Sequence, residues 1–513
     1  MTDLYLDLPP PQARRGAAPE RLPGDAPGAV RALVAGLAKR GVRFCHWKSN
    51  LRLAEAMAGA EDLDLLVRRE DAGRLLAAAI EAGFRPAVSR GGMGHPGVIH
   101  AFALNDDASG LVHLHAYFGV VTGDSLVKCF RLPIEEDLLA GGHRLHGLPV
   151  PPPEAELALF ALRVLLKHAD LVEVAMVARG YDAVRRELRW LRGRADLSAA
   201  QTLWRRWLPA GDPPRLAEAL AAIEAEGGRG RLERIRLGLR LSRALRDRRR
   251  IGHAAARFQR KLRVWRMLRN RRAGRRDLAL QTGGLVVAMV GPKGVGKSTL
   301  GGEIARRLGR DLDMLRVHAG RPPATWLSFA PRLLTPLARR LFRSERTGEY
   351  EKPERRASGR WSLLFVLRMT LLAHDRRALL RRCWREAASG AIVVTDRYPS
   401  QTPGAIDSGV FDNAAVAAER SILKRWLMRR EQALCRGVPG PQLVLRLEAS
   451  PETAVRRDAA RDKPGGPDAD AVRRRWGMET CADFGAAPVA IIDTDRPLAA
   501  SAEAAARAIW RAL

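Results

Sequence analysis

Cysteine is scarce in this chain, with five residues scattered over 513 positions and no C-x-x-C pair. An odd number of isolated cysteines argues against a disulfide framework and against a cysteine zinc site. Long hydrophobic runs are also missing. The longest apolar segments, such as 361–372, are too short to span a bilayer, and this one contains Arg368. The first residues, MTDLYLDLPPP, lack the basic segment followed by an apolar one that a secretory signal requires. These absences predict a cytoplasmic protein without a transmembrane segment.

Acidic residues are outnumbered by basic ones, 56 to 88, which gives a formal net charge of +32. Such an excess attracts polyanions, including nucleotides and nucleic acid. Arginine, however, is spread through every predicted helix as well as clustered, so we interpret the overall charge as a solubility and steering property. The apolar content of 46% and charged content of 28% are those of a soluble globular protein.

The length predicts more than one domain, and the pattern predicts an α/β multidomain fold in four segments. Residues 1–26 are rich in Pro, Gly, Ala and Arg and predict a flexible leader. Residues 27–150 predict a small α/β domain, which ends at a triple proline. Residues 151–283 predict a basic helical connecting region, and residues 284–513 a second α/β domain.

Apolar runs and periodicity place the expected elements. The first domain is expected to contain helices at 29–40 and 71–82 and strands at 42–47, 63–67, 98–104 and 111–118. The second is expected to contain buried strands at 285–290, 391–395, 443–447 and 489–492. Because helices alternate with these apolar strands, the pattern predicts a doubly wound parallel sheet for the second domain.

The segment 229–276 is the most basic part of the connecting region, with 20 Lys or Arg among 48 residues. One hypothesis is an arm that binds nucleic acid or acidic lipid. Base-stacking aromatic residues are nearly absent from it, so we favour a solvated amphipathic helix or helix pair.

The sequence LVVAMVGPKGVGKST at 285–299 matches G-x-x-x-x-G-K-[ST] directly after a strand and at the start of a helix. Glycines let backbone N–H groups turn inward around a phosphate, and the helix N-terminus adds positive potential. Lys297 is expected to reach the β- and γ-phosphate oxygens, and Ser298 to ligate magnesium. The predicted ATP-binding residues are Gly291, Lys293, Gly294, Val295, Gly296, Lys297, Ser298 and Thr299.

A second candidate segment, GAIVVTDRYPS, ends another buried strand. Asp396 therefore lies at the carboxyl edge of the sheet, where ligands bind in open α/β folds. Its carboxylate is expected to act through Mg²⁺, and Arg397 to hold an anionic acceptor.

These residues resemble the thymidylate kinases, within the wider nucleoside monophosphate kinases, and the resemblance covers about 285–513. The triplet Asp396-Arg397-Tyr398 is similar to the family signature after its third strand. The resemblance implies substrate-binding roles for Arg376, Arg397 and Tyr398, and it matches Arg457 and Arg461 to catalytic lid positions. It also implies ATP and Mg²⁺ as cofactors.

The P-loop departs from that family at one position. Lys293 stands where thymidylate kinases usually carry an acidic residue, which reverses the local charge on the acceptor side. The expected acceptor is therefore a nucleotide or another small anionic molecule, and thymidine monophosphate is not singled out.

The first domain carries an Asp-x-Asp pair, Asp62 and Asp64, whose carboxylates project from one face of a strand. With Ser49-Asn50 upstream, the pair resembles the nucleotidyltransferase superfamily, and this resemblance spans about 30–150. It implies a second magnesium site at Asp62 and Asp64. His113 occupies the place where a third acid is expected, so the two-metal arrangement is incomplete.

Three functions remain open at this point. The first is an ATP-dependent kinase, with Lys297, Asp396, Arg397, Arg457 and Arg461 as its catalytic residues. The second is a regulatory or scaffold protein that binds ATP as a switch. The third is a nucleic-acid-binding or modifying protein, which the composition does not favour. The sequence leaves the acceptor and the oligomeric state open.

Overall fold

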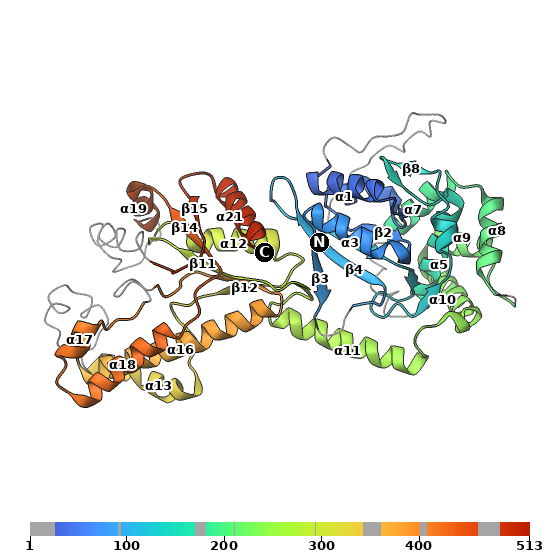
Figure 1. The fold of residues 1–513 in the computed structure, drawn as a ribbon. Helices are drawn as coiled ribbons and strands as arrows, with labels where there is room; N and C mark the ends of the chain where they lie inside the picture. The colour runs from blue at the N-terminus through green and yellow to red at the C-terminus, as the bar shows by residue number, and fades with distance from the viewer. Residues whose placement is uncertain are drawn as a thin grey trace. The chain divides into compact units, whose positions relative to one another are not determined.

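The structure is a computed structural model that describes residues 26–90, 94–169, 181–209, 211–292, 294–341, 361–400, 408–459 and 483–513. It forms two compact units, Met1–Asp277 and Leu278–Leu513 (Figure 1). The first unit contains both the small α/β segment and the basic helices. The finer division into the four expected segments stays a prediction, and residues 1–25 of the expected leader lie outside the described residues.

The main sheet of the first unit has neighbouring strands in the order β1-β2-β5-β4-β3. Their bounds are β1 Phe44–His46, β2 Leu63–Val67, β3 Arg85–Ser89, β4 Val98–Leu104 and β5 Leu111–Tyr117. Strands β2 and β5 are parallel, and the other neighbours are antiparallel. All the strands that we expected in this segment are present, and β3 was not expected.

Helices cover both faces of this sheet. On one face, α1 (Gly28–Lys39) and α3 (Ala72–Glu81) share a core with alternate β2 side chains such as Leu63 and Leu65. On the other face, Leu66 and Tyr117 join a core built around α5 (Pro153–His168). Side chains alternate along a strand, so Asp64 lies on the α5 side of β2.

The remaining elements of this unit are short segments and a set of helices packed on α5. They are α2 Leu53–Met57, β6 Val120–Thr122, β7 Phe130–Leu132, α4 Glu135–Leu138, β8 Arg144–Leu145, β9 Leu148–Pro149, α7 Tyr181–Arg192, α8 Leu197–Trp207, α9 Leu216–Glu224, α10 Gly227–Ala244 and α11 His253–Arg272.

Arginines of α11 and of the segment before it hold the helices to the rest of the unit. Arg260 Nη2 lies 3.1 Å from Oδ2 of the buried Asp124, and Arg263 Nη2 donates to the carbonyl of Gly94 at 3.1 Å. Arg250 donates through its backbone N–H to the carbonyl of Cys129. The basic run from 229 to 276 therefore forms helices, as expected, and part of it contacts the rest of this unit instead of being solvated.

The second unit contains a parallel sheet with strand order β12-β13-β11-β14-β15. The bounds are β11 Val286–Val290, β12 Met314–Val317, β13 Ile392–Thr395, β14 Leu443–Glu448 and β15 Val489–Asp493, with β10 at Leu278–Leu280 before them. Four of the five sheet strands were expected, and the predicted parallel sheet is confirmed.

The sheet of the second unit is covered on both faces (Figure 1). Val286, Ala288 and Val290 form a core with residues of α16 (Leu363–Ala388). The intervening Met289 points the other way, toward α12 (Lys297–Leu308), which packs beside α21 (Leu498–Ala512). The doubly wound arrangement follows from the two-sided burial of β11.

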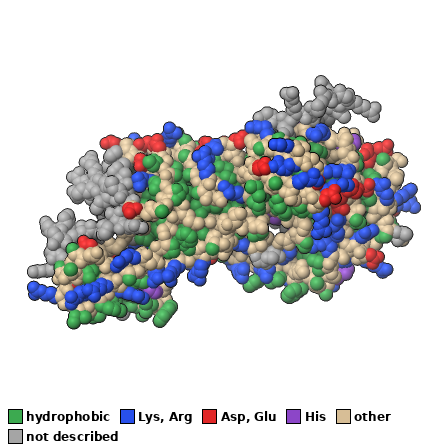
Figure 2. Space-filling view, in the orientation of Figure 1, with side chains coloured by type: hydrophobic (Ala, Val, Ile, Leu, Met, Phe, Trp, Pro, Cys, Tyr) green, Lys and Arg blue, Asp and Glu red, His purple; other side chains and the backbone are tan. Residues whose placement is uncertain are grey.

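The other helices of this unit are α13 Trp326–Leu341, α17 Asn413–Ala418, α18 Ile422–Arg436 and α19 Pro451–Ala459. Several apolar side chains on α13, α16 and α18 are exposed, including Trp326, Phe329 and Trp426. Figure 2 shows Lys and Arg side chains interspersed with hydrophobic ones over the visible face. Within the described ranges, no helix combines the length and apolarity needed to cross a membrane.

Candidate functional site

The glycine-rich loop of the second unit lies between β11 and the N-terminus of α12. Gly296 precedes the helix with a φ of 98°, and Lys297 is the first helical residue. Gly291 has a φ of +141°, and a Cβ there would lie 2.5 Å from the carbonyl oxygen of Leu447. Gly294 has a φ of +90°, and its Cβ would lie 2.4 Å from a backbone oxygen of α19. The loop conformation therefore requires glycine for both backbone and packing reasons.

The side chain of Lys297 folds back over this loop. Its ammonium donates to the carbonyl oxygen of Gly291 and, at 3.0 Å, to that of Pro292. Ser298 and Thr299 are exposed in the first turn of α12. An ammonium and a helix N-terminus beside one glycine loop form a suitable cradle for phosphate. Lys293 lies outside the described residues.

Asp396 follows β13, the strand directly beside β11. The parallel register pairs Ala288 with Thr395, so the aspartate comes level with the end of β11, shortly before the glycine loop. Its backbone N–H donates to the carbonyl of Val317, and its side chain is 28% exposed. The glycine loop and Asp396 therefore lie at the same edge of the sheet, as expected.

His318 is a site residue that sequence reasoning missed. It follows β12, and its Nδ1 is hydrogen-bonded to Oδ2 of Asp396. Oδ1 of the same carboxylate is buried and has no hydrogen-bond partner among the described residues. Carboxylate and hydroxyl oxygens are the ligands that Mg²⁺ prefers, so the free oxygen of Asp396 and the exposed Ser298 hydroxyl fit a magnesium ion.

Both arginines predicted to bind the acceptor contact the short segment after β12. Arg376 on α16 is 7% exposed, and its Nε donates to the carbonyl of Ala319 at 3.3 Å. Arg397 is exposed, and its Cδ lies 2.7 Å from where a Cβ at Gly320 would be. Since His318 holds Asp396, the segment 318–320 contacts Arg376 on α16 as well as the neighbouring pair Asp396 and Arg397.

Tyr398 lies in the core and makes structural contacts. Its hydroxyl donates to the carbonyl of Pro439 and accepts from Nε1 of Trp384 at 3.2 Å. Burial raises the pKa of Tyr398 to about 12, so the phenol stays neutral. Tyr398 also lines a cavity of about 850 Å³, together with residues such as Ser400, Phe411 and Gln432.

The expected lid is described only in part. Arg457 lies on α19, and its Nη2 donates to the carbonyl of Thr494 at 2.8 Å, in the turn after β15. Arg461 lies outside the described residues. The catalytic role of both arginines stays a prediction.

The Asp-x-Asp pair of the first unit contacts histidines and a lysine. Asp62 Oδ1 lies 2.8 Å from His113 Nδ1, whereas Asp64 Oδ1 lies 2.8 Å from Lys48 Nζ and 3.1 Å from His115 Nδ1. Burial alone would raise the pKa of Asp64, but Lys48 and His115 outweigh it and hold that pKa below its usual value. Within the described part of the chain, no three His, Cys, Asp or Glu side chains converge as metal ligands do. The magnesium assignment at Asp62 and Asp64 stays a prediction.

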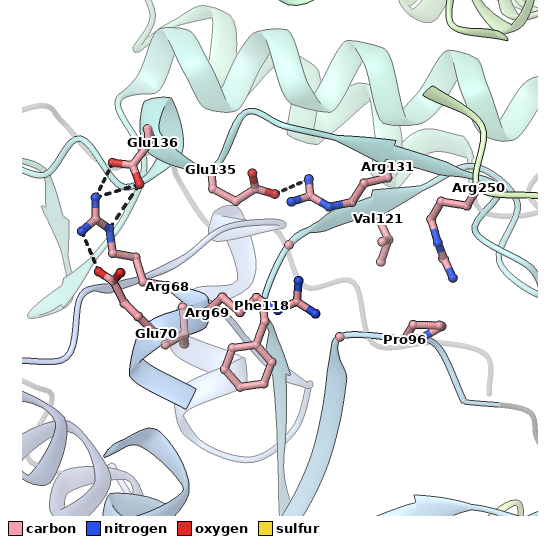
Figure 3. A pocket seen from close by; sticks show the side chains of 13 residues that line it. Arg68, Arg69, Glu70, Pro96, Phe118, Val121, Arg131, Glu135, Glu136 and Arg250 are labelled. Carbon is pink, nitrogen blue, oxygen red and sulfur yellow. Dashed lines mark hydrogen bonds and ion pairs between the residues drawn. The ribbon is translucent and has the colours of Figure 1, made fainter. Parts of the chain in front are cut away.

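The first unit also contains a cavity of about 470 Å³, shown in Figure 3. Most of its charged side chains are paired with one another. Arg68 binds Glu136 and Glu70, and Arg131 binds Glu135. The positive charge of this cavity is therefore largely compensated.

No protein-family model matches this chain, and no curated protein matches it. Among the solved structures that match part of it are a sugar kinase and a thymidylate kinase. A sugar kinase from Janibacter sp. is 14% identical over 44% of this chain and 94% of its own, with a TM-score of 0.24. A thymidylate kinase from Candida albicans is 15% identical over 43% of this chain and 88% of its own, with a TM-score of 0.23. At these scores the two matches do not assign the chain to a family.

Proposed function

We propose that the second unit is an ATP-dependent phosphotransferase, similar to thymidylate and other nucleoside monophosphate kinases. In the reaction, an acceptor oxygen attacks the γ-phosphorus of ATP, the bond to the β,γ-bridging oxygen breaks, and ADP leaves. The acceptor proton passes to solvent or to a nearby base. Such transfers need positioning and charge neutralisation more than covalent chemistry from the protein.

One observation carries this proposal: a glycine loop and an aspartate stand at the ends of neighbouring parallel strands. The loop offers backbone N–H groups and the Lys297 ammonium to the phosphates. Asp396 offers a carboxylate oxygen without another partner in the described residues. Magnesium, held by Ser298 and Asp396, would neutralise charge on the phosphate oxygens.

The acceptor is proposed to bind beside the segment 318–320. Arg376 and Arg397 both contact this segment and supply two positive charges close to Asp396. A phosphate or carboxylate on the acceptor would suit them. The proposed acceptor is therefore a nucleotide or another small anionic molecule, and Arg457 and Arg461 are proposed to approach the transferred group from the lid.

The test measures ADP formation and acceptor phosphorylation by the full chain, with a panel of nucleoside monophosphates and sugars. Lys297→Ala is expected to reduce transfer by roughly 10² to 10³, the loss typical when one charge-stabilising donor is removed. Arg429→Ala, at an exposed position of α18 in the same unit, is the control and should retain activity. Tight Mg·ATP binding without transfer to any acceptor would replace this proposal with the ATP-dependent regulator.

A further inference from the structure

Two lysines of the first unit point at one buried oxygen atom. Lys48 Nζ donates to the hydroxyl of Tyr117 at 2.9 Å, and Lys128 Nζ donates to the same oxygen at 3.0 Å. Both ammonium groups also lie over the Tyr117 ring, 4.7 and 4.8 Å from its centroid. A neutral phenol brings no negative charge to offset two cations, so a carboxylate or phosphate oxygen would accept stronger hydrogen bonds from them.

The carboxylate in contact with these lysines does not balance their charge. Asp64 lies 2.8 Å from Lys48 and contributes one negative charge. Arg163 and Lys167, one turn apart on α5, add positive charge that acts on Lys128, and the carboxyl of Glu187 acts on both of them. Burial, and then repulsion from Lys48, lower the pKa of Lys128 to about 7. Burying positive charge without enough negative charge nearby costs free energy, so binding of an anion would stabilise this cluster.

Backbone strain is concentrated at the same place. Ser49, next to Lys48, has a φ of 57°, and Lys128 itself has a φ of 49°. Among the described residues, the others outside glycine with such angles are Ala108 and His146. A non-glycine residue in this conformation costs on the order of 1 kcal/mol or more, and such strain clusters at ligand-binding sites.

We propose that Lys48 and Lys128 form a metal-independent binding site for a phosphate group of a small ligand. A phosphate dianion would take over the hydrogen bonds that the two ammonium groups now give to Tyr117, and it would supply the missing negative charge. Asp64 pairs with Lys48 and holds its ammonium group in place. Asp64 is therefore a positioning residue in this site, and this role requires no metal ion. The side chain of Lys48 is 16% exposed and Lys128 is partly exposed, so both lysines keep some contact with solvent.

The cavity in Figure 3 provides an internal comparison within the same unit. Two of its four arginines, Arg68 and Arg131, are paired with carboxylates, whereas in the lysine cluster Asp64 pairs with Lys48. Arg69, which lines that cavity and is exposed, is therefore a suitable control residue. Its removal takes one positive charge from this unit without touching the lysine cluster.

The experiment uses the full chain carrying Lys297→Ala, in EDTA, with inorganic phosphate and pyrophosphate as probes in a calorimetric titration. Any residual binding at the glycine loop is common to all variants compared. Adding Lys48→Ala or Lys128→Ala is expected to weaken pyrophosphate binding by about tenfold or more, since each removes a charge-assisted hydrogen bond. Adding Arg69→Ala should leave the affinity unchanged.

Tyr117→Phe separates a binding role from a structural one. It removes the oxygen that accepts from both lysines and keeps the ring, so the proposal expects tighter pyrophosphate binding. Weaker or unchanged binding in Tyr117→Phe, unchanged binding in both lysine variants, or a loss caused by Arg69→Ala would each overturn the site. If a lysine variant fails to fold, the Tyr117→Phe titration still decides. The outcome does not depend on the kinase activity of the second unit.

Discussion

The imidazole of His318 is hydrogen-bonded through Nδ1 to Oδ2 of Asp396 and so links the ends of β12 and β13. One carboxylate oxygen is held, and the other has no hydrogen-bond partner among the described residues. Outer hydrogen bonds of this kind orient metal-binding carboxylates, and their loss typically costs 10- to 100-fold in affinity or activity.

Replacement of His318 by alanine is therefore expected to lower kcat by roughly tenfold or more, through a mobile Asp396. ATP affinity measured without magnesium should stay close to that of the unaltered chain, because the glycine loop is intact. His253→Ala, at the exposed start of α11, is the control. An unchanged kcat in His318→Ala would show that the histidine does not position the carboxylate.

A side chain at Gly294 is expected to disrupt the phosphate cradle. Gly294→Ala must adopt a φ of +90° and place its Cβ 2.4 Å from the Ala454 carbonyl oxygen. The backbone strain alone costs on the order of 1–3 kcal/mol, so the loop should shift and ATP affinity should fall.

The matched control is Gly302→Ala, on α12, where the nearest atom is a flexible Arg316 nitrogen at 3.6 Å. Alanine inside a helix is favoured over glycine by roughly 0.5–1 kcal/mol, so this variant should unfold at an equal or higher temperature. Calorimetric ATP binding and thermal unfolding check both variants. Equal ATP affinity in Gly294→Ala and Gly302→Ala would contradict the prediction.

Glu156 is expected to make stability depend on pH. Burial, and then Glu187, raise the pKa of this carboxyl from 4.5 to about 8 in the folded protein. Between these two values the folded state binds more protons than the unfolded chain. The free energy of unfolding therefore falls as pH rises across this window.

Glu156→Gln removes the titration and should flatten the decline between pH 5 and pH 8, as followed by urea unfolding of the first unit. The control is Glu154→Gln, on the same helix and partly exposed. If the decline persists unchanged in Glu156→Gln, another group causes it.

Asp375 is expected to stabilise the region around the proposed acceptor site. Its Oδ1 accepts from Thr325 Oγ1 and Ser328 Oγ, both at 2.7 Å, and its Oδ2 lies 2.8 Å from Arg332. Asp375→Ala removes the acceptor of the buried Ser328 hydroxyl and of the partly exposed Thr325 and Arg332, which should cost about 3 kcal/mol of unfolding free energy. Asp375→Asn should cost less, because it keeps an acceptor oxygen. Equal stability of the two variants in urea would argue against this network.

Much of the second unit could be predicted because its signals are local. The apolar run before Gly291 is short and is bounded by glycines, as is typical of a strand buried on both faces, and the glycine spacing that follows can be recognised without the fold. Strand β12 was missed because only Met314 of its four residues is buried, so it shows no continuous apolar run. Its neighbour His318 was missed with it.

The sequence by itself determined the apolar strands of the parallel sheet, the glycine loop and the strand that precedes Asp396. Each of these depends on residues that are adjacent in the chain. The tertiary structure alone decided which side chains meet. It placed His318 against Asp396 and brought Arg376 to the same segment. It also gave Asp64 a lysine partner from another strand end. The physical reason is that partners distant in sequence are chosen by how strands align and helices pack, and no local pattern of residue types encodes that alignment.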